Sequence, residues 1–228
     1  GLNFYAPSDN FRSNNYLQLD FQNGNFSYGI QYESYLPSAL LGYSEIFDNN
    51  EGIAQYYFKY ENTNSEITVG SFYEQFGNGL VFRAWEDRQL GINNSLRGIR
   101  YRFSPLKEIE ISAIHGKQRF GFEYSNSVIS GINSNIDISK IVKLNKFSFS
   151  IGLRHLKRYQ KLNAGFGEPE NVNLSGVSLD LFYKDFYINA ELAKKGKDVI
   201  ANEGEILSER MYDGTALQVD IGYSKKGL

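Results

Sequence analysis

The sequence predicts an all-β protein with the architecture of an antiparallel, up-and-down transmembrane β-barrel. Three observations lead to this prediction. Apolar and polar side chains alternate with a period of two, in segments close to the roughly ten residues that a membrane-spanning strand needs. The connections between these segments alternate between short and long. The polar face of each segment carries charges and amides, which cannot form a dry core but can line a water-filled lumen.

The alternation recurs in about eleven segments, and no segment has a convincing helical pattern. The second segment is typical, because Phe26, Tyr28 and Ile30 alternate there with Ser27, Gly29 and Gln31. We treat residues 1–228 as a single barrel domain or a segment of one. The predicted strands lie near 14–22, 26–36, 53–61, 65–74, 95–103, 107–116, 131–142, 146–157, 174–183, 186–194 and 214–224.

The predicted connections support a membrane barrel over a soluble β-protein. Tight periplasmic turns and longer extracellular loops alternate in such barrels, whereas Greek-key connections would place long loops at both ends of a sandwich. Tyrosines at the ends of the apolar faces are typical of the aromatic girdles of membrane barrels. These are Tyr28, Tyr60, Tyr73, Tyr101, Tyr183 and Tyr223. The alternative is a soluble meander with one hydrated face. The short connections lie near 23–25, 62–64, 104–106, 143–145 and 184–185, and the long ones near 37–52, 75–94, 117–130, 158–172 and 196–213.

The number of strands predicts that this chain is part of a larger barrel. Bacterial single-chain barrels have an even number of strands, with both ends on the periplasmic side. The first predicted strand runs into a short turn, so residues 1–13 are expected to end an outer loop that follows a further strand. Alternatively, Leu2–Ala6 is a twelfth strand, although it is shorter than the roughly nine to eleven residues that span a bilayer.

Composition excludes several classes of function. With 24 basic and 26 acidic residues, the net charge of -2 argues against a basic nucleic-acid-binding protein. The absence of cysteine excludes disulfides, thiolate metal sites and a cysteine nucleophile. The two histidines leave few members for a zinc or acid–base site, and no spacing suggests a catalytic triad. We therefore expect no enzymatic activity, no cofactor and no metal.

The long connection at 75–94 is the most distinctive segment. It could fold into the lumen and narrow it, or present a surface to a partner. The interpretation we favour is that it packs on the rim as a structural lid with internal ion pairs. Its candidate residues are glycines that permit tight backbone and charges beside an indole, namely Phe76, Gly77, Gly79, Arg83, Trp85, Glu86, Asp87 and Arg88.

A ladder of charges is predicted inside the barrel. If the turn at 104–106 has three residues, antiparallel pairing places Arg102 opposite Glu108 and Arg100 opposite Glu110. Such a ladder could tune ion selectivity, as side-chain rings do in pores. The alternative, which we favour, is that the charges neutralise each other and hold the register.

Basic residues gather on the side of the long loops. On an outer rim, these cations would meet the phosphates of lipopolysaccharide. The alternative is a solvated rim with no specific ligand. The residues concerned are Lys117, Arg119, Lys157, Arg158, Lys161, Lys194 and Lys195.

The segment Phe72–Arg88, with Leu90-Gly91 and Asn94–Gly98 after it, resembles the hallmark of a family of outer-membrane proteins of unknown function from Bacteroidota. Shorter matches at Tyr32–Pro37 and His115–Arg119 agree with the resemblance, which covers most of the chain. The members of this family look like exported barrels that are longer than this chain. The resemblance implies an outer-membrane location and no mechanism, since the family has no established functional residues.

We therefore expect a bacterial outer-membrane β-barrel that acts as a pore or transport-type channel of unknown substrate. The alternative is a structural or secretion-associated barrel that binds partner proteins through its long loops. The expected partners are outer-membrane lipid and lipopolysaccharide, with other outer-membrane or secretion proteins as further candidates, and no nucleic acid.

Overall fold

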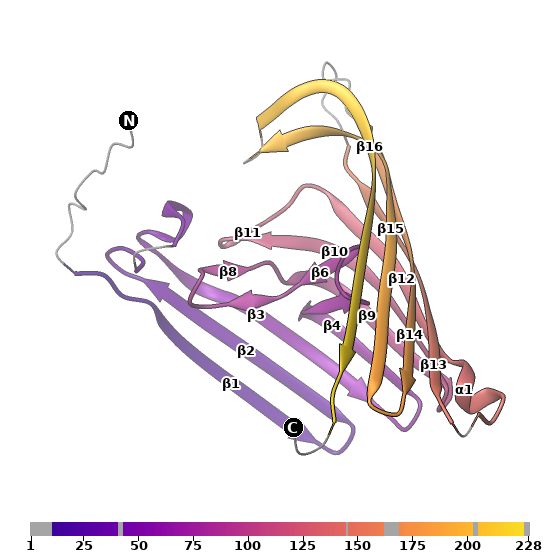
Figure 1. Ribbon diagram of the computed structural model, residues 1–228. Helices are drawn as coiled ribbons and strands as arrows, with labels where there is room; N and C mark the ends of the chain where they lie inside the picture. Colours follow the sequence, from indigo (N-terminus) through magenta and orange to yellow (C-terminus); the bar gives the residue numbers. More distant parts are fainter. Residues whose placement is uncertain (1–10, 41–42, 145, 162–168, 203–204, 226–228) are drawn as a thin grey trace.

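The protein folds into one large antiparallel sheet. The computed structural model describes residues 11–40, 43–144, 146–161, 169–202 and 205–225. In these residues, eleven strands pair in the order β1-β2-β3-β4-β9-β10-β12-β13-β14-β15-β16, so each long strand lies beside the next one along the chain. The predicted all-β, up-and-down topology is confirmed. Within the described residues β1 and β16 do not pair with each other, and the sheet is open (Figure 1).

The elements are the following. The sheet contains β1 (Asn15–Asn23), β2 (Phe26–Tyr35), β3 (Asn50–Glu61), β4 (Ser65–Phe72), β9 (Leu96–Leu106), β10 (Ile109–Phe120), β12 (Val128–Asp137), β13 (Ser148–Tyr159), β14 (Asn171–Tyr183), β15 (Phe186–Asn202) and β16 (Glu205–Tyr223). The short elements are η1 (Glu45–Phe47), β5 (Glu74–Phe76), β6 (Phe82–Ala84), β7 (Glu86–Asp87), β8 (Ile92–Asn93), β11 (Glu123–Tyr124) and α1 (Ile138–Ile141).

The two faces of the sheet differ as the alternation predicts. In β2, Ser27, Gln31 and Glu33 are buried, whereas Phe26 and Tyr28 are exposed. The sheet curves, and the short strands β6 and β8 lie within its curve (Figure 1). The polar side chains therefore face inward, and the apolar side chains face outward.

Some predicted boundaries differ from the structure, most clearly at two connections. The strand expected over 131–142 ends at Asp137, whose carboxylate caps α1 by accepting hydrogen bonds from the Lys140 N–H (3.1 Å) and the Ser139 hydroxyl (2.5 Å). The connection to β13 is thus longer than the predicted turn at 143–145. The long connection expected at 196–213 is instead mostly strand, since β15 and β16 pair as far as Asn202 and Glu205 through several register shifts.

Tight turns at one end of the sheet explain its regular pairing. Gly24 (φ +56°) and Lys184 (φ +54°) have left-handed backbones in the two-residue turns after β1 and β14. Among the described residues, no helix is both long enough and apolar enough to cross a membrane. The predicted alternative strand at Leu2–Ala6 lies outside the described residues.

Candidate functional site in the interior of the sheet

An inner hairpin, residues 74–84, occupies the interior of the curved sheet. Its strands β5 and β6 pair Glu74 with Ala84 and Phe76 with Phe82. The tip turns sharply at Gly77 (φ +56°) and Gly79 (φ +95°), and the Gly79 N–H donates to the Phe76 carbonyl at 3.0 Å. Both glycines are required there, because side chains rarely tolerate these dihedral angles.

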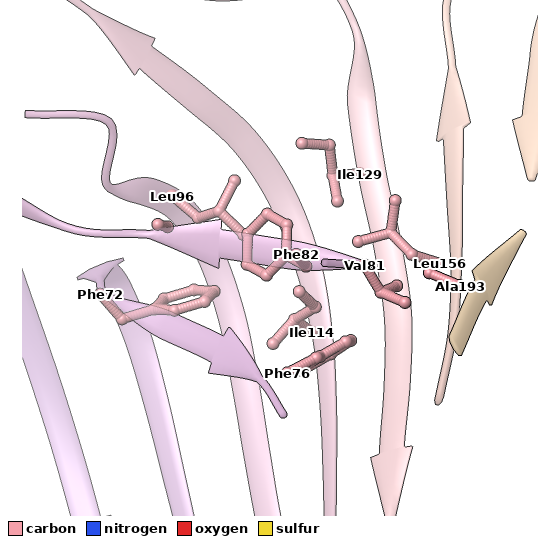
Figure 2. Packing of buried hydrophobic residues seen from close by; sticks show 10 residues of the cluster. Phe72, Phe76, Val81, Phe82, Leu96, Ile114, Ile129, Leu156 and Ala193 are labelled. Carbon is pink, nitrogen blue, oxygen red and sulfur yellow. The ribbon is translucent and has the colours of Figure 1, made fainter. Parts of the chain in front are cut away.

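The inner hairpin packs its aromatic side chains on the wall of the sheet. Phe76 and Phe82 contact each other edge to face, with 5.6 Å between ring centroids. Both belong to a buried apolar cluster that Figure 2 shows against the neighbouring strands. The sheet contributes inward-facing residues that interrupt its otherwise polar interior, namely Leu96, Ile114, Ile129, Leu156 and Ala193.

Glycines in the wall make room for this packing. A Cβ atom on Gly131 would lie 2.8 Å from the Phe76 ring, and one on Gly176 would lie 2.7 Å from a methyl group of Val81. Any side chain at either position would collide with the inner hairpin. The surface of the wall and the shape of the hairpin are therefore complementary.

Polar contacts fix the tip of the inner hairpin to the far wall. The Asn78 N–H donates to the Glu191 carboxylate at 2.6 Å, and the Asn78 side chain donates to Asn189. Gly77 lies against the guanidinium of Arg154, which leaves no space for a side chain. The hairpin thus crosses the interior from β4 to β15.

The far wall is itself held by a buried ion pair. Arg154 and Glu191 lie 2.9 Å apart, with side chains 1% and 0% exposed. Arg154 also donates to Asn133 (3.2 Å) and Ser178 (3.0 Å). A single arginine therefore connects β12, β13, β14 and β15 below the hairpin tip, and its charge is compensated as a buried charge must be.

The base of the inner hairpin is anchored by the predicted arginines, but with different partners. Arg102 pairs with Glu74 at 2.9 Å, and Arg100 pairs with Glu66 at 2.6 Å and donates to the Tyr73 carbonyl at 2.8 Å. Toward the short turns, a polar cavity of about 210 Å³ lies beside Arg102. Both arginines face inward, where they neutralise carboxylates.

The predicted pairing of these arginines with Glu108 and Glu110 is wrong. Arg102 lies opposite Ser112 and Arg100 opposite Ile114, because β9 continues to Leu106 and the register shifts between Ile109 and Ile111. Glu108 lies in the turn, and Glu110 pairs with Asn135 of β12, although it lines the same cavity as Arg102.

A second buried ion pair lies nearer the long loops. Arg119 contacts both carboxylate oxygens of Glu33, at 3.0 and 2.7 Å, and both side chains are 1% exposed. Glu33 also accepts from Gln31 and Tyr35. Tyr35 leads into an aromatic cluster in which Phe47, Tyr16, Tyr43 and Phe122 pack together with Ala39 and Ile46.

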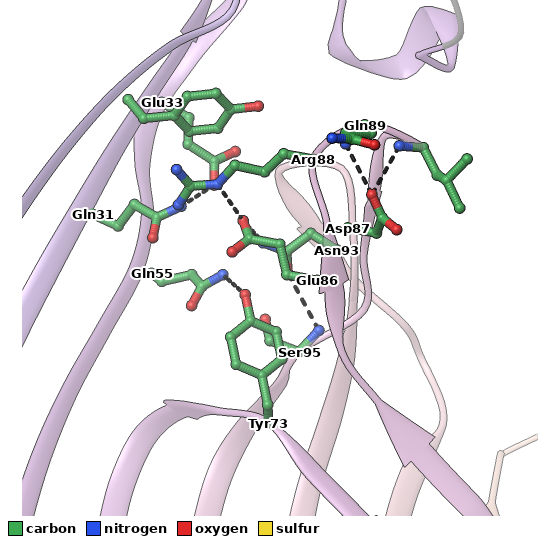
Figure 3. Close-up of polar contacts among 12 residues, drawn as sticks. Gln31, Glu33, Gln55, Tyr73, Glu86, Asp87, Arg88, Gln89, Asn93 and Ser95 are labelled. Carbon is green, nitrogen blue, oxygen red and sulfur yellow. Dashed lines mark hydrogen bonds and ion pairs between the residues drawn. The ribbon is translucent and has the colours of Figure 1, made fainter. Parts of the chain in front are cut away.

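An outer hairpin, residues 85–94, contains β7 and β8 and follows the inner one. Arg88 pairs with Glu86 at 3.2 Å (Figure 3). It also stacks over the Tyr16 ring at 4.3 Å. The Tyr43 hydroxyl donates to the Arg88 carbonyl at 2.6 Å, and burial raises the pKa of Tyr43, so the hydroxyl stays protonated. The expected internal ion pair is therefore present in the outer hairpin, for which the rim lid stays a prediction, whereas the inner hairpin lies in the interior of the sheet.

The remaining residues of the motif divide between the two hairpins. Arg83 is exposed and stacks over Trp85 at 4.2 Å. Asp87 accepts hydrogen bonds from the backbone of Gln89 and Leu90, which closes the outer hairpin. Tyr73, expected at the end of an apolar face, instead lies inside, where its hydroxyl accepts from Gln55 at 2.7 Å (Figure 3).

The predicted basic rim separates into two groups. Arg119, Arg158 and Lys195 form ion pairs on the inner side, with Glu33 for the first and Asp198 for the other two. They are not rim cations: Arg158 and Lys195 continue the inward-facing positions of Arg154 in β13 and Glu191 in β15, where the pairing is regular. The exposed members are Lys117, Lys157, Lys161 and Lys194.

Several site residues were missed by the sequence analysis. Asn78, Glu191 and Arg154 were not among the candidate residues, although the alternation does place Arg154 and Glu191 on the inner face. The sequence did contain one usable signal, which is a group of apolar residues at the inward positions of consecutive strands. Such a group marks the part of the wall on which another segment of the chain packs. Among the described residues, no three histidine or carboxylate side chains are grouped as a metal site would require.

Solved structures with a similar fold are outer-membrane porins, at very low identity. OccK2 (OpdF) of Pseudomonas aeruginosa in complex with glucuronate is 10% identical, with a TM-score of 0.43, over 82% of this chain and 59% of that chain. OccK10 (OpdN) of the same organism is 9% identical, with a TM-score of 0.43, over 95% and 63%. A BenF-like porin from Pseudomonas fluorescens Pf-5 is 11% identical, with a TM-score of 0.41, over 81% and 60%.

The chain therefore spans about three fifths of the length of these porins. No curated protein matches its sequence significantly. A family model matches residues 1–228 in full. The chain belongs to the family of unknown function DUF6029.

Proposed function

We propose that the protein is a non-enzymatic outer-membrane β-barrel channel of unknown substrate, narrowed by the inner hairpin. The observation that carries this proposal is the outward face of the sheet, on which apolar side chains are exposed along every long strand. Leu19, Leu153 and Ile221, from strands far apart, are 59%, 52% and 72% exposed. A soluble protein rarely exposes so large an apolar surface, whereas a lipid-facing strand requires it.

The edges of the sheet support the same proposal. In the described residues, β1 and β16 leave backbone groups unpaired along their outer sides. Unpaired backbone groups are very unfavourable in a bilayer, so each edge must pair with another strand when the protein is in the membrane. In this proposal further strands supply that pairing, and the whole barrel is wider than this sheet.

The interior supports conduction past the inner hairpin. The hairpin is fixed to both walls, through Glu74 at its base and Asn78 at its tip. Polar and charged side chains line the wall on the side of the short turns, as they would in a hydrated passage. The inner hairpin is therefore a constriction in this proposal, and the rest of the lumen is the path.

Single-channel conductance of the full-length protein in planar bilayers tests this function. The proposal predicts discrete, ohmic current steps that scale with salt concentration. The absence of current from folded, inserted protein would contradict it. That outcome, together with a partner that co-purifies in stoichiometric amount, would favour the secretion-associated alternative.

A further inference from the structure

Four cations lie on the outward face near the long loops. They are Arg97 on β9, Lys117 on β10, Lys157 on β13 and Lys194 on β15, and we name them the outer cation belt. Each must face outward, since the residues beside it in its strand face inward and are buried or half-buried. These neighbours are Leu96, Gly98, Gly116, Gln118, Leu156, Arg158, Ala193 and Lys195.

The outer cation belt lies at a constant distance from the short turns. Arg97 is nine residues from Leu106, the end of β9, and Lys157 is nine from Ser148, the start of β13. Lys117 and Lys194 are each eight residues from the first residue of β10 and of β15. With about 3.3 Å per residue and a tilt of about 40°, eight or nine residues rise about 20–23 Å, close to the roughly 25 Å of the apolar band in a membrane barrel.

The outward face between the short turns and the belt has no negative charge and is mostly apolar, with His115, His155 and a few serines among its outward positions. Ile99, Leu153 and Leu192, the exposed apolar residues of three belt strands, are 40%, 52% and 44% exposed. In the described strands from β9 to β15, the outward positions of this zone contain no aspartate or glutamate. The belt cations also form no ion pair with any described residue.

Two belt cations lie side by side in a way that favours an anion. Arg97 and Lys117 are direct cross-strand partners, and like charges in such positions are destabilising. The guanidinium of Arg97 is held by Tyr56 and Tyr124, 4.8 and 3.9 Å from their ring centroids. Arginine binds phosphate through the N–H groups at the edge of its guanidinium, so a guanidinium positioned by stacking is suited to an oxyanion.

We propose that the outer cation belt binds the phosphates of lipid A, the phosphorylated glycolipid anchor of lipopolysaccharide in the outer leaflet. The belt cations lie at one height, at the edge of the apolar band that is far from the short turns. No carboxylate forms an ion pair with them among the described residues. The inference rests on the outer-membrane location in the proposed function and is independent of conduction.

Native mass spectrometry of the full-length protein in detergent tests this binding. The protein is titrated with lipid A, with enzymatically dephosphorylated lipid A and with phosphatidylglycerol. Lipid A is expected to bind with an affinity at least about tenfold above the other two. Equal binding of dephosphorylated lipid A would overturn the role of the phosphates, and equal binding of phosphatidylglycerol would overturn the assignment to lipid A.

Matched variants separate the belt from general charge. The variant Lys117→Gln/Lys157→Gln/Lys194→Gln is expected to lose lipid A affinity by at least about tenfold. The same three positions changed to Arg should retain it, which also shows that the positions tolerate substitution. Lys107→Gln/Lys146→Gln removes exposed cations at the short-turn end and should leave affinity unchanged. Undiminished binding by the triple Gln variant would overturn the proposal, whether or not the protein conducts.

Discussion

The inner and outer hairpins are adjacent in sequence but are fixed in different ways. The inner hairpin is held by buried aromatic rings and by carboxylates on both walls, with Phe76 0% exposed. The outer hairpin is held by its own turns, by the half-exposed pair of Arg88 with Glu86, and by contacts of Arg88 with Tyr16 and Tyr43. The inner hairpin is thus fixed by burial in the wall, whereas the outer hairpin is fixed by contacts that are more exposed.

The largest difference in stability is expected when the carboxylate that holds each hairpin is removed. Glu191→Ala leaves Arg154 buried without its partner and removes the acceptor of the Asn78 N–H, and it should lower the free energy of unfolding by about 3–5 kcal/mol. Glu86→Ala, the matched change in the outer hairpin, should lower it by less than about 1 kcal/mol. Urea titration in lipid vesicles measures both, and equal effects would show that the tip contact is unimportant.

The next comparison removes an apolar side chain from each hairpin. Phe76→Ala empties a buried site in the apolar cluster on the wall and should destabilise the protein by about 3–5 kcal/mol. Leu90 is 59% exposed, so Leu90→Ala should change stability by no more than about 0.5 kcal/mol. Thermal unfolding followed by circular dichroism distinguishes the two. A Phe76 variant as stable as the Leu90 variant would mean that the hairpin does not pack on the wall.

A subtler test changes the wall and leaves the inner hairpin intact. Gly131→Ala and Gly176→Ala each place a Cβ atom closer to the hairpin than van der Waals contact allows. We expect each change to lower the free energy of unfolding by about 1–3 kcal/mol through overpacking. Gly214→Ala is the control, because nothing lies within 4 Å of its Cβ position. The same urea titration applies. A smaller loss for the two wall glycines than for the control would contradict the close contact.

The smallest effect is expected at Arg88. Arg88→Gln removes a half-exposed ion pair and a stacking contact with Tyr16, and it should cost about 1 kcal/mol or less. Limited proteolysis of the outer hairpin should increase even so, since local opening becomes easier. A loss of several kcal/mol would show that the outer hairpin is as firmly fixed as the inner one.

Strand identity and facing could be predicted from the sequence, because both follow from the period of two. The register at Arg102 could not. The turn was expected at 104–106, but β9 continues through Pro105 at an irregular part of the ladder, and the two-residue turn comes later. Neither residue type nor spacing distinguishes these two arrangements.

The place of the inner hairpin was also beyond sequence reasoning. Its apolar side chains are also compatible with a lid on the rim. An apolar residue at an inward position, such as Ile114 or Leu156, is by itself a common exception to the alternation of polar and apolar side chains. Only the fold shows that these exceptions meet at one site and face Phe76. The buried partners Arg119 and Glu33 likewise lie 86 residues apart, a separation that no local pattern reports.

The most direct test of the central claim is which hairpin limits the current. Single-channel conductance is measured for the full-length protein and for two variants, one with residues 76–82 and one with residues 86–93 replaced by a short Gly-Ser linker. We expect the change in the inner hairpin to raise the conductance severalfold and the change in the outer hairpin to leave it nearly unchanged. Equal conductance of the inner-hairpin variant and the unmodified protein would contradict a constriction at the inner hairpin.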